Sequence, residues 1–120
     1  ALANPKLAPY GRAAVETLTR MGVWPAWQSR VVMGENIAQA YQFVSTGNAP
    51  LGFVALSQVW AQGQIREGSA WIVPASWHTP IRQDLILLNP GRDNPAAQAL
   101  LTYLRSDSTR ALIRSYGYDI

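Results

Sequence analysis

The chain has 120 residues, of which 48% are hydrophobic and 14% are charged, a composition typical of one globular domain with a buried core. Its net charge is +3, but the nine arginines and the single lysine are scattered, so the sequence lacks the clustered basic face that nucleic-acid binding requires. The absence of cysteine excludes thiol catalysis, disulfides and thiolate metal sites, and no apolar run approaches the roughly 20 residues of a membrane span.

The first predicted elements are a short strand and the loop that leads out of it. The apolar run 1–3 is predicted to be an interior strand, and because a domain rarely opens so abruptly, we expect the chain to be a fragment. Prolines at positions 5 and 9 restrict the path of the loop 4–11 into a helix and leave the first amides of that helix pointing outward. These amides lie at the positive end of the helix dipole and can bind an anion, although an ordinary proline-containing loop explains the same residues.

Helices and strands alternate in the next part of the chain. Apolar residues at helical spacing predict a helix that ends at Gly22, and Asn36 is a suitable N-cap for a second helix. The predicted elements are a helix over 11–21, a turn with core tryptophans at 24 and 27, a strand over 30–33, a helix from 37 that stops at 46–48, and a strand over 51–56. This order predicts an α/β fold with a largely parallel sheet, in which ligands lie beyond the carboxyl ends of the strands.

The remaining chain is predicted to add two strands and two helices. A polar connection leads into a strand over 70–74, a rigid connector over 75–80 and the strongest strand pattern of the chain over 81–88. Asn94, with Pro95 at the first helical position, starts the next helix, and a last helix over 108–116 ends at Gly117. We place a domain boundary near Pro80, which divides the chain into residues 1–80 and 81–120.

Residues with catalytic or metal-binding chemistry do not form a recognisable set. His78 is the only histidine and has no carboxylate at ligand spacing, so we expect it to be structural. Neither Glu16 nor Asp84 has an evident partner for acid–base chemistry, and the sequence contains no nucleophile elbow or phosphate-binding loop. The five tryptophans lack a regular spacing and are expected in the core. We therefore expect no enzymatic activity.

Four stretches of the chain resemble one family in their order and spacing. They are Asn4-Pro5 through Pro9-Tyr10-Gly11, Gly34-Glu35-Asn36-Ile37, Val44 through Gly47-Asn48-Ala49-Pro50-Leu51-Gly52-Phe53-Val54, and Tyr116-Gly117-Tyr118. Together they resemble the periplasmic molybdate-binding protein of bacterial ABC importers, over essentially the whole chain but only the C-terminal half of the family's length. The resemblance implies the second lobe of a type 2 periplasmic binding protein fold, with an oxyanion-binding lobe over 1–80. It also implies that 81–120 supply a return strand and C-terminal helices that pack on a first lobe preceding Ala1.

The resemblance further implies a ligand and two donors. Molybdate or tungstate would be held as a bare dianion by neutral donors, without another cofactor and with no metal beyond that of the oxyanion. The donors of the second lobe map onto the backbone amides of Tyr10 and Ile37, so Tyr10→Ala is expected to change the affinity little. Some members add a tyrosine hydroxyl at the position that is Ala55 here, so either Tyr10 compensates or there are fewer donors. Glu35, a carboxylate beside this site, is expected to point to solvent.

The resemblance implies a periplasmic protein whose partners are the ABC permease subunits of the membrane, and we expect no nucleic-acid partner. Without the first lobe, the fragment is expected to bind the anion weakly, and its unpartnered tail is expected to form a homodimer, either as an exposed face or by exchange. The apolar tail residues are Ala97, Leu100, Leu101, Leu104, Leu112 and Ile113. The alternative function is a ligand-sensing effector domain of a transcription regulator with the same fold. The choice among molybdate, tungstate and sulfate depends on both lobes and stays open.

Overall fold

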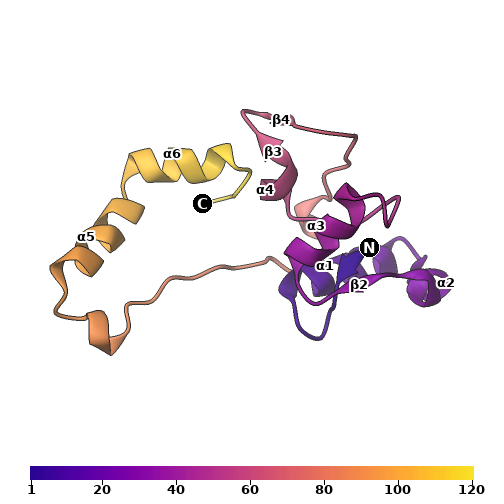
Figure 1. Cartoon of the computed structure of the whole chain (residues 1–120), viewed down its shortest axis with the longest axis horizontal. Coiled ribbons are helices and arrows are strands. Elements are labelled where there is room, and N and C mark those ends of the chain that lie inside the picture. Colours follow the sequence, from indigo (N-terminus) through magenta and orange to yellow (C-terminus); the bar gives the residue numbers. More distant parts are fainter.

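Two short parallel strands and two helices form the centre of the N-terminal part. In the computed structural model, which describes residues 1–120, β1 (Leu2–Ala3) pairs in parallel with β2 (Met33–Gly34). Helices α1 (Pro9–Arg20) and α3 (Ile37–Ser45) pack against this pair (Figure 1). The predicted strand–helix–strand–helix order is therefore confirmed for residues 1–45, although both strands are short.

Helix α1 starts and stops at residues whose backbone suits a helix end. Pro9 occupies the first turn, where a missing N–H costs nothing, and Gly22 follows the helix with a left-handed φ of 74°. The helix predicted over 11–21 is thus confirmed with an earlier start. Its inner face contributes to a small apolar core made of Leu2, Ala14 and Leu18, partly covered by Val23, Trp24, Val31 and Phe53.

Helix α3 begins at the predicted N-cap. The side chain of Asn36 accepts a hydrogen bond from the backbone N–H of Gln39 at 3.0 Å, which satisfies one of the otherwise unpaired amides of the first turn. The helix ends at Thr46, after which Gly47 has a φ of 76°. Both ends agree with the sequence prediction.

Four predicted strands are wrong in whole or in part. The strand predicted over 30–33 is reduced to β2. The 51–56 segment forms no strand, although the Phe53 N–H donates to the Ala1 carbonyl oxygen at 2.9 Å. The segments 70–74 and 81–88 also form none. A strand exists only where a neighbouring strand takes its backbone hydrogen bonds, and an apolar pattern alone does not provide that neighbour.

A hairpin that was not predicted follows the short helix α4 (Leu56–Val59). Strands β3 (Trp60–Ala61) and β4 (Gln64–Ile65) pair in antiparallel fashion. The two residues between them, Gln62 and Gly63, have φ values of 54° and 82°, as the tight mirror-image turn of a two-residue hairpin requires. The sequence indicates only a polar, glycine-containing connection here.

The tryptophans are less buried than predicted. Two short helices, α2 (Trp24–Trp27) and η1 (Gln28–Arg30), follow α1, and Trp24 packs against the core. Trp27, however, is 41% exposed and lies 5.5 Å from the guanidinium of Arg30. Trp71 is 56% exposed and packs edge-on against Trp77 of η2 (Ala75–Trp77), with ring centroids 5.3 Å apart. The prediction that all five lie in the core is therefore wrong for Trp27 and Trp71, and the other three are only half-buried.

Residues 81–120, which we call the arm, extend away from residues 1–80, which we call the lobe. After an extended segment, the arm contains η3 (Asn89–Gly91), α5 (Pro95–Leu104) and α6 (Asp107–Ser115), capped by Asn94 and Ser106, so both predicted helices are confirmed. Figure 1 shows the arm leading outward and turning back, so that the C terminus lies near α4. The radius of gyration is 17.0 Å, whereas a compact domain of this length would have about 14 Å.

Candidate oxyanion site

The carboxyl ends of β1 and β2 meet at one edge, and each strand leads into a helix there. The Asn4 N–H donates to the Gly34 carbonyl oxygen at 2.7 Å, so the two segments are still paired as they leave the sheet. Helix α1 then starts at Pro9 and α3 starts at Ile37. In open α/β sheets, this edge is where ligands bind.

Two glycines allow the helices to approach the strand ends closely. A Cβ added at Gly11 would overlap the carbonyl oxygen of Ala3, and one added at Gly34 would lie 2.8 Å from the backbone nitrogen of Ala40. Backbone atoms cannot move aside as a flexible side chain can, so neither position accepts a larger residue without a shift of the helix. The two glycines therefore fix how close the helix starts lie to the sheet edge.

Three amides at these helix starts have no acceptor within the chain. Pro9 has no N–H, and the N–H of Tyr10, the next residue of α1, makes no hydrogen bond. In α3 the amides of Ile37 and Ala38 are also free, because the Asn36 side chain takes the N–H of Gln39 instead. The two predicted donors, Tyr10 and Ile37, thus present free N–H groups at the starts of two helices on the same strand pair. Their assignment to a ligand stays a prediction.

Gln58 connects the start of α4 to the start of α3. Its side-chain oxygen accepts the N–H of Ala55 at 2.9 Å, and its side-chain nitrogen donates to the Ile37 carbonyl oxygen at 3.3 Å. Ala55 is only 4% exposed and has no side-chain donor, so this position lacks the extra hydroxyl that the resemblance implies for some members of the family. Gln58 is not among the predicted residues. The signal for it is its position three residues after the N-cap, where a glutamine reaches back to the cap amide.

The side chain of Tyr10 contacts the arm. The side-chain nitrogen of Gln83 donates to the Tyr10 hydroxyl at 3.0 Å, and the Tyr118 hydroxyl lies 3.1 Å from the hydroxyl oxygen of Ser57. Burial raises the pKa of Tyr10, and Tyr118 raises it further, while the hydrogen bond from Gln83 lowers it. The net effect is a rise, so the Tyr10 hydroxyl is neutral at physiological pH.

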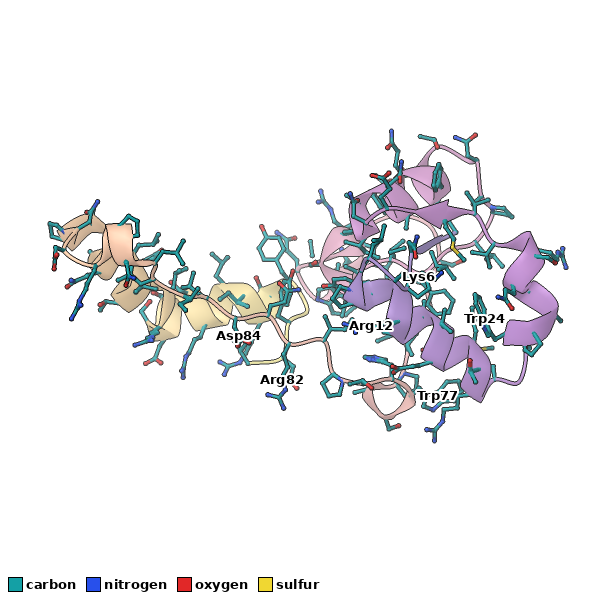
Figure 2. The ribbon with its side chains drawn as sticks, turned by 90° about the horizontal axis from the view of Figure 1, so that it is seen from below. Lys6, Arg12, Trp24, Trp77, Arg82 and Asp84 are labelled. Carbon is teal, nitrogen blue, oxygen red and sulfur yellow. The ribbon has the colours of Figure 1, made fainter.

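Charged side chains do not gather at this edge to form a metal site or an acid–base pair. Glu35 is exposed, as expected for a carboxylate beside an anion site. Glu16 accepts the Thr79 N–H at 2.5 Å, which joins α1 to the connector. The His78 ring nitrogen Nδ1 lies 2.9 Å from the Thr79 carbonyl oxygen, within the connector. Figure 2 shows Asp84 on the extended segment of the arm. No group of three or more acidic or histidine side chains lies close enough to hold a metal ion.

The fold and this edge define the class of the protein: an α/β lobe with free backbone N–H groups at the carboxyl ends of two parallel strands. Comparison with known sequences agrees. The chain belongs to the family of bacterial extracellular solute-binding proteins, whose family model matches residues 1–119. No helix combines the length and the apolar character needed to span a membrane.

Its relatives include proteins named for molybdate. The chain is 54% identical over 119 residues to the molybdate-binding protein ModA of Azotobacter vinelandii, covering 99% of this chain and 47% of that protein. It is 46% identical over 118 residues to ModA of Rhodobacter capsulatus, covering 98% of this chain and 46% of that protein. The solved structure of the Azotobacter vinelandii periplasmic molybdate-binding protein matches 99% of this chain and 52% of that one, with a TM-score of 0.89 and 32% identity.

These comparisons confirm several predictions. The α/β fold of a type 2 periplasmic binding protein and the resemblance to molybdate-binding proteins are both confirmed, and the chain spans about half the length of the curated relatives it matches. Because the family consists of solute-binding proteins, the expectation of no enzymatic activity is confirmed as well. The alternative of a transcription-regulator domain finds no support among these relatives. The domain boundary near Pro80 stays a prediction.

Proposed function

We propose that this chain forms half of an oxyanion site and binds molybdate or tungstate for delivery to an ABC importer. The observation that carries the proposal is the pair of free N–H groups, those of Tyr10 and Ile37, at two helix starts on one sheet edge. An oxyanion supplies the acceptors that these amides lack, and helix dipoles favour negative charge at that end. The names of the relatives select molybdate among the possible anions.

The proposed ligand is the bare dianion, with no further cofactor. Backbone N–H groups donate directly to its oxygen atoms. Tungstate has the same charge and tetrahedral shape, so a site that binds one by hydrogen bonds binds the other. Discrimination against the smaller sulfate would then depend on cavity size and on the number of donors.

The proposal divides the site between this chain and a first lobe that corresponds to the other half of its relatives. A hydrogen bond to a charged group contributes about 1.5–3 kcal/mol, so two of them give about 3–6 kcal/mol and a dissociation constant no tighter than about 0.04 mM. The first lobe would add donors and exclude water. The complete protein would act in the periplasm and present its closed lobes to the permease subunits.

The arm has a role in the same proposal. In the two-lobe protein it would pack on the first lobe, which would bury the apolar faces of α5 and α6. Leu100 and Leu112 are each 55% exposed in the chain alone. Large exposed apolar faces mark interaction surfaces, so the isolated chain would form a homodimer through the arm, either by direct contact or by exchange.

The test is a titration of the ¹⁵N-labelled chain with sodium molybdate, followed by NMR. We expect the amide signals of Tyr10 and Ile37 to shift with a dissociation constant between about 0.04 mM and several millimolar. Ile37→Pro removes one donor at a helix position that tolerates proline, and should weaken binding by roughly tenfold or more. Ile37→Val, which keeps the amide, is the matched control. Submicromolar binding by this chain would contradict a divided site, and unchanged affinity in Ile37→Pro would remove Ile37 from it.

A further inference from the structure

The arm is attached to the lobe at two points that lie close to each other. Where the arm leaves, Gln83 donates a hydrogen bond to the Tyr10 hydroxyl at 3.0 Å. Where it returns, the Tyr118 hydroxyl pairs with Ser57 at 3.1 Å, and the Tyr118 side chain is near enough to Tyr10 to raise its pKa. Residues that are 73 positions apart, Tyr10 and Gln83, are thus joined at the root of the arm.

Tyr10 therefore belongs both to the candidate oxyanion site and to the root of the arm. Its backbone N–H is the first free amide of α1, at the sheet edge. Its hydroxyl accepts a hydrogen bond from the Gln83 side chain of the arm. Tyr10 lies in the first turn of α1, where its own amide makes no helix hydrogen bond. Its position therefore depends more on side-chain contacts than does the position of a residue inside the helix.

We propose that Gln83 is a positioning residue for the anion site, which holds Tyr10 by its hydroxyl so that the backbone N–H of Tyr10 points to the ligand. This inference rests on the proposed function, in which that N–H is one of the donors. Gln83 does not touch the anion. It acts through Tyr10 and connects the place where the arm joins the lobe to the place where the ligand binds.

The proposal changes what is expected for Tyr10. If only its backbone mattered, as the sequence alone suggests, Tyr10→Ala would change the affinity little. With the hydroxyl as an anchor, even Tyr10→Phe weakens binding, because the amide remains but is no longer held. Since the contact is one ordinary hydrogen bond, the expected loss is about 2- to 10-fold in affinity.

The experiment is a double-mutant cycle in the 120-residue chain, with sodium molybdate as the probe. Tyr10→Phe and Gln83→Ala should each weaken binding by about 2- to 10-fold, and the double variant should be no weaker than the weaker single variant, because both changes remove the same contact. At saturating molybdate, the shift of the Tyr10 amide signal should shrink while that of Ile37 is retained. A merely structural loss would reduce both signals.

The controls use the same substitutions at exposed positions without side-chain hydrogen bonds. Gln28→Ala in η1 and Tyr103→Phe in α5 should bind as the unaltered chain does. Full affinity and an unchanged Tyr10 shift in Gln83→Ala would overturn the positioning role while leaving the proposed function in place. Loss of affinity in Tyr10→Phe but not in Gln83→Ala would also overturn it, since the hydroxyl would then be a direct donor. No molybdate-induced shift at Tyr10 or Ile37 in the unaltered chain would overturn both proposals.

Discussion

Gly11, in the first turn of α1, packs so closely on Ala3 that a Cβ at position 11 would overlap the Ala3 carbonyl oxygen. We therefore expect Gly11→Ala to lower the free energy of unfolding by about 3 kcal/mol, the upper end of overpacking, because backbone atoms must shift to make room. Urea unfolding followed by tryptophan fluorescence measures this.

A second glycine gives the matched control. Gly22 lies just after the end of α1, where a Cβ would meet nothing, and only its φ of 74° resists replacement. Gly22→Ala should therefore cost about 1 kcal/mol, from backbone strain alone. Equal stability of the two variants would show that α1 does not lie on the strand end as described.

The connector is held to α1 by the side chains of Glu16 and Arg20, and Arg20 donates a hydrogen bond to the Ser76 carbonyl oxygen at 3.0 Å. Glu16 accepts hydrogen bonds from the Thr79 N–H at 2.5 Å and from the Thr79 hydroxyl at 3.3 Å. Glu16→Ala should make the Thr79 amide exchange its proton about fivefold faster, which corresponds to the loss of about 1 kcal/mol for an exposed hydrogen bond. Glu16→Gln keeps an acceptor and should retain most of the protection. Hydrogen exchange that is slow in all three proteins would show that the contact does not hold the connector.

The raised pKa of Tyr10 predicts a loss of stability in alkaline solution. The unfolded chain ionises this hydroxyl near the ordinary value of 10.0, whereas the folded chain keeps it neutral to a higher pH. Between these two pKa values the unfolded state binds fewer protons, so the free energy of unfolding falls as the pH rises. The stabilisation that the neutral Tyr10 hydroxyl gives to the folded state is complete below about pH 10 and is lost above it. Tyr10→Phe should flatten the decline, measured by urea unfolding from about pH 9 to 11, while Tyr103→Phe should not.

Self-association of the isolated chain is the fourth prediction. The extended segment of the arm exposes Leu85, Ile86 and Leu88, with Ile86 at 79%. An apolar strand pattern without a partner favours pairing with another chain. We expect light scattering at micromolar concentrations to show a dimer, and Ile86→Lys to shift it toward monomer. A monomer at every concentration, with slow hydrogen exchange in α5 and α6, would mean that the arm is stable alone.

The helices could be predicted from the sequence because their ends depend on neighbouring residues. Pro9, Asn36 and Asn94 start helices for local reasons, and Gly22 and Gly117 follow helices in a left-handed conformation that glycine adopts at no cost. The strands could not be predicted as reliably, because each depends on a neighbour far away in the sequence. The 81–88 segment has the strongest strand pattern, yet no other strand pairs with it.

The same distinction between local and distant contacts holds for the candidate site. The free amides of Tyr10 and Ile37 could be predicted, since Pro9 and the Asn36 cap lie next to them in the sequence. The contact of Gln83 with the Tyr10 hydroxyl could not, because it joins residues 73 positions apart. The link from Gln58 to the Ile37 carbonyl oxygen, across 21 positions, is of the same kind.

The attachment of the arm at two points limits how it can move. A rigid body held at one point can turn about three axes, but a body held at two points can only swing about the line that joins them. For the arm that line passes through the contacts of Gln83 and Tyr118, beside Tyr10. If the arm moved as one body, α5 and α6 would swing together about that line. Such a swing would carry the far end of the arm over a wide arc while the hydroxyl of Tyr10, on the axis, stays almost still.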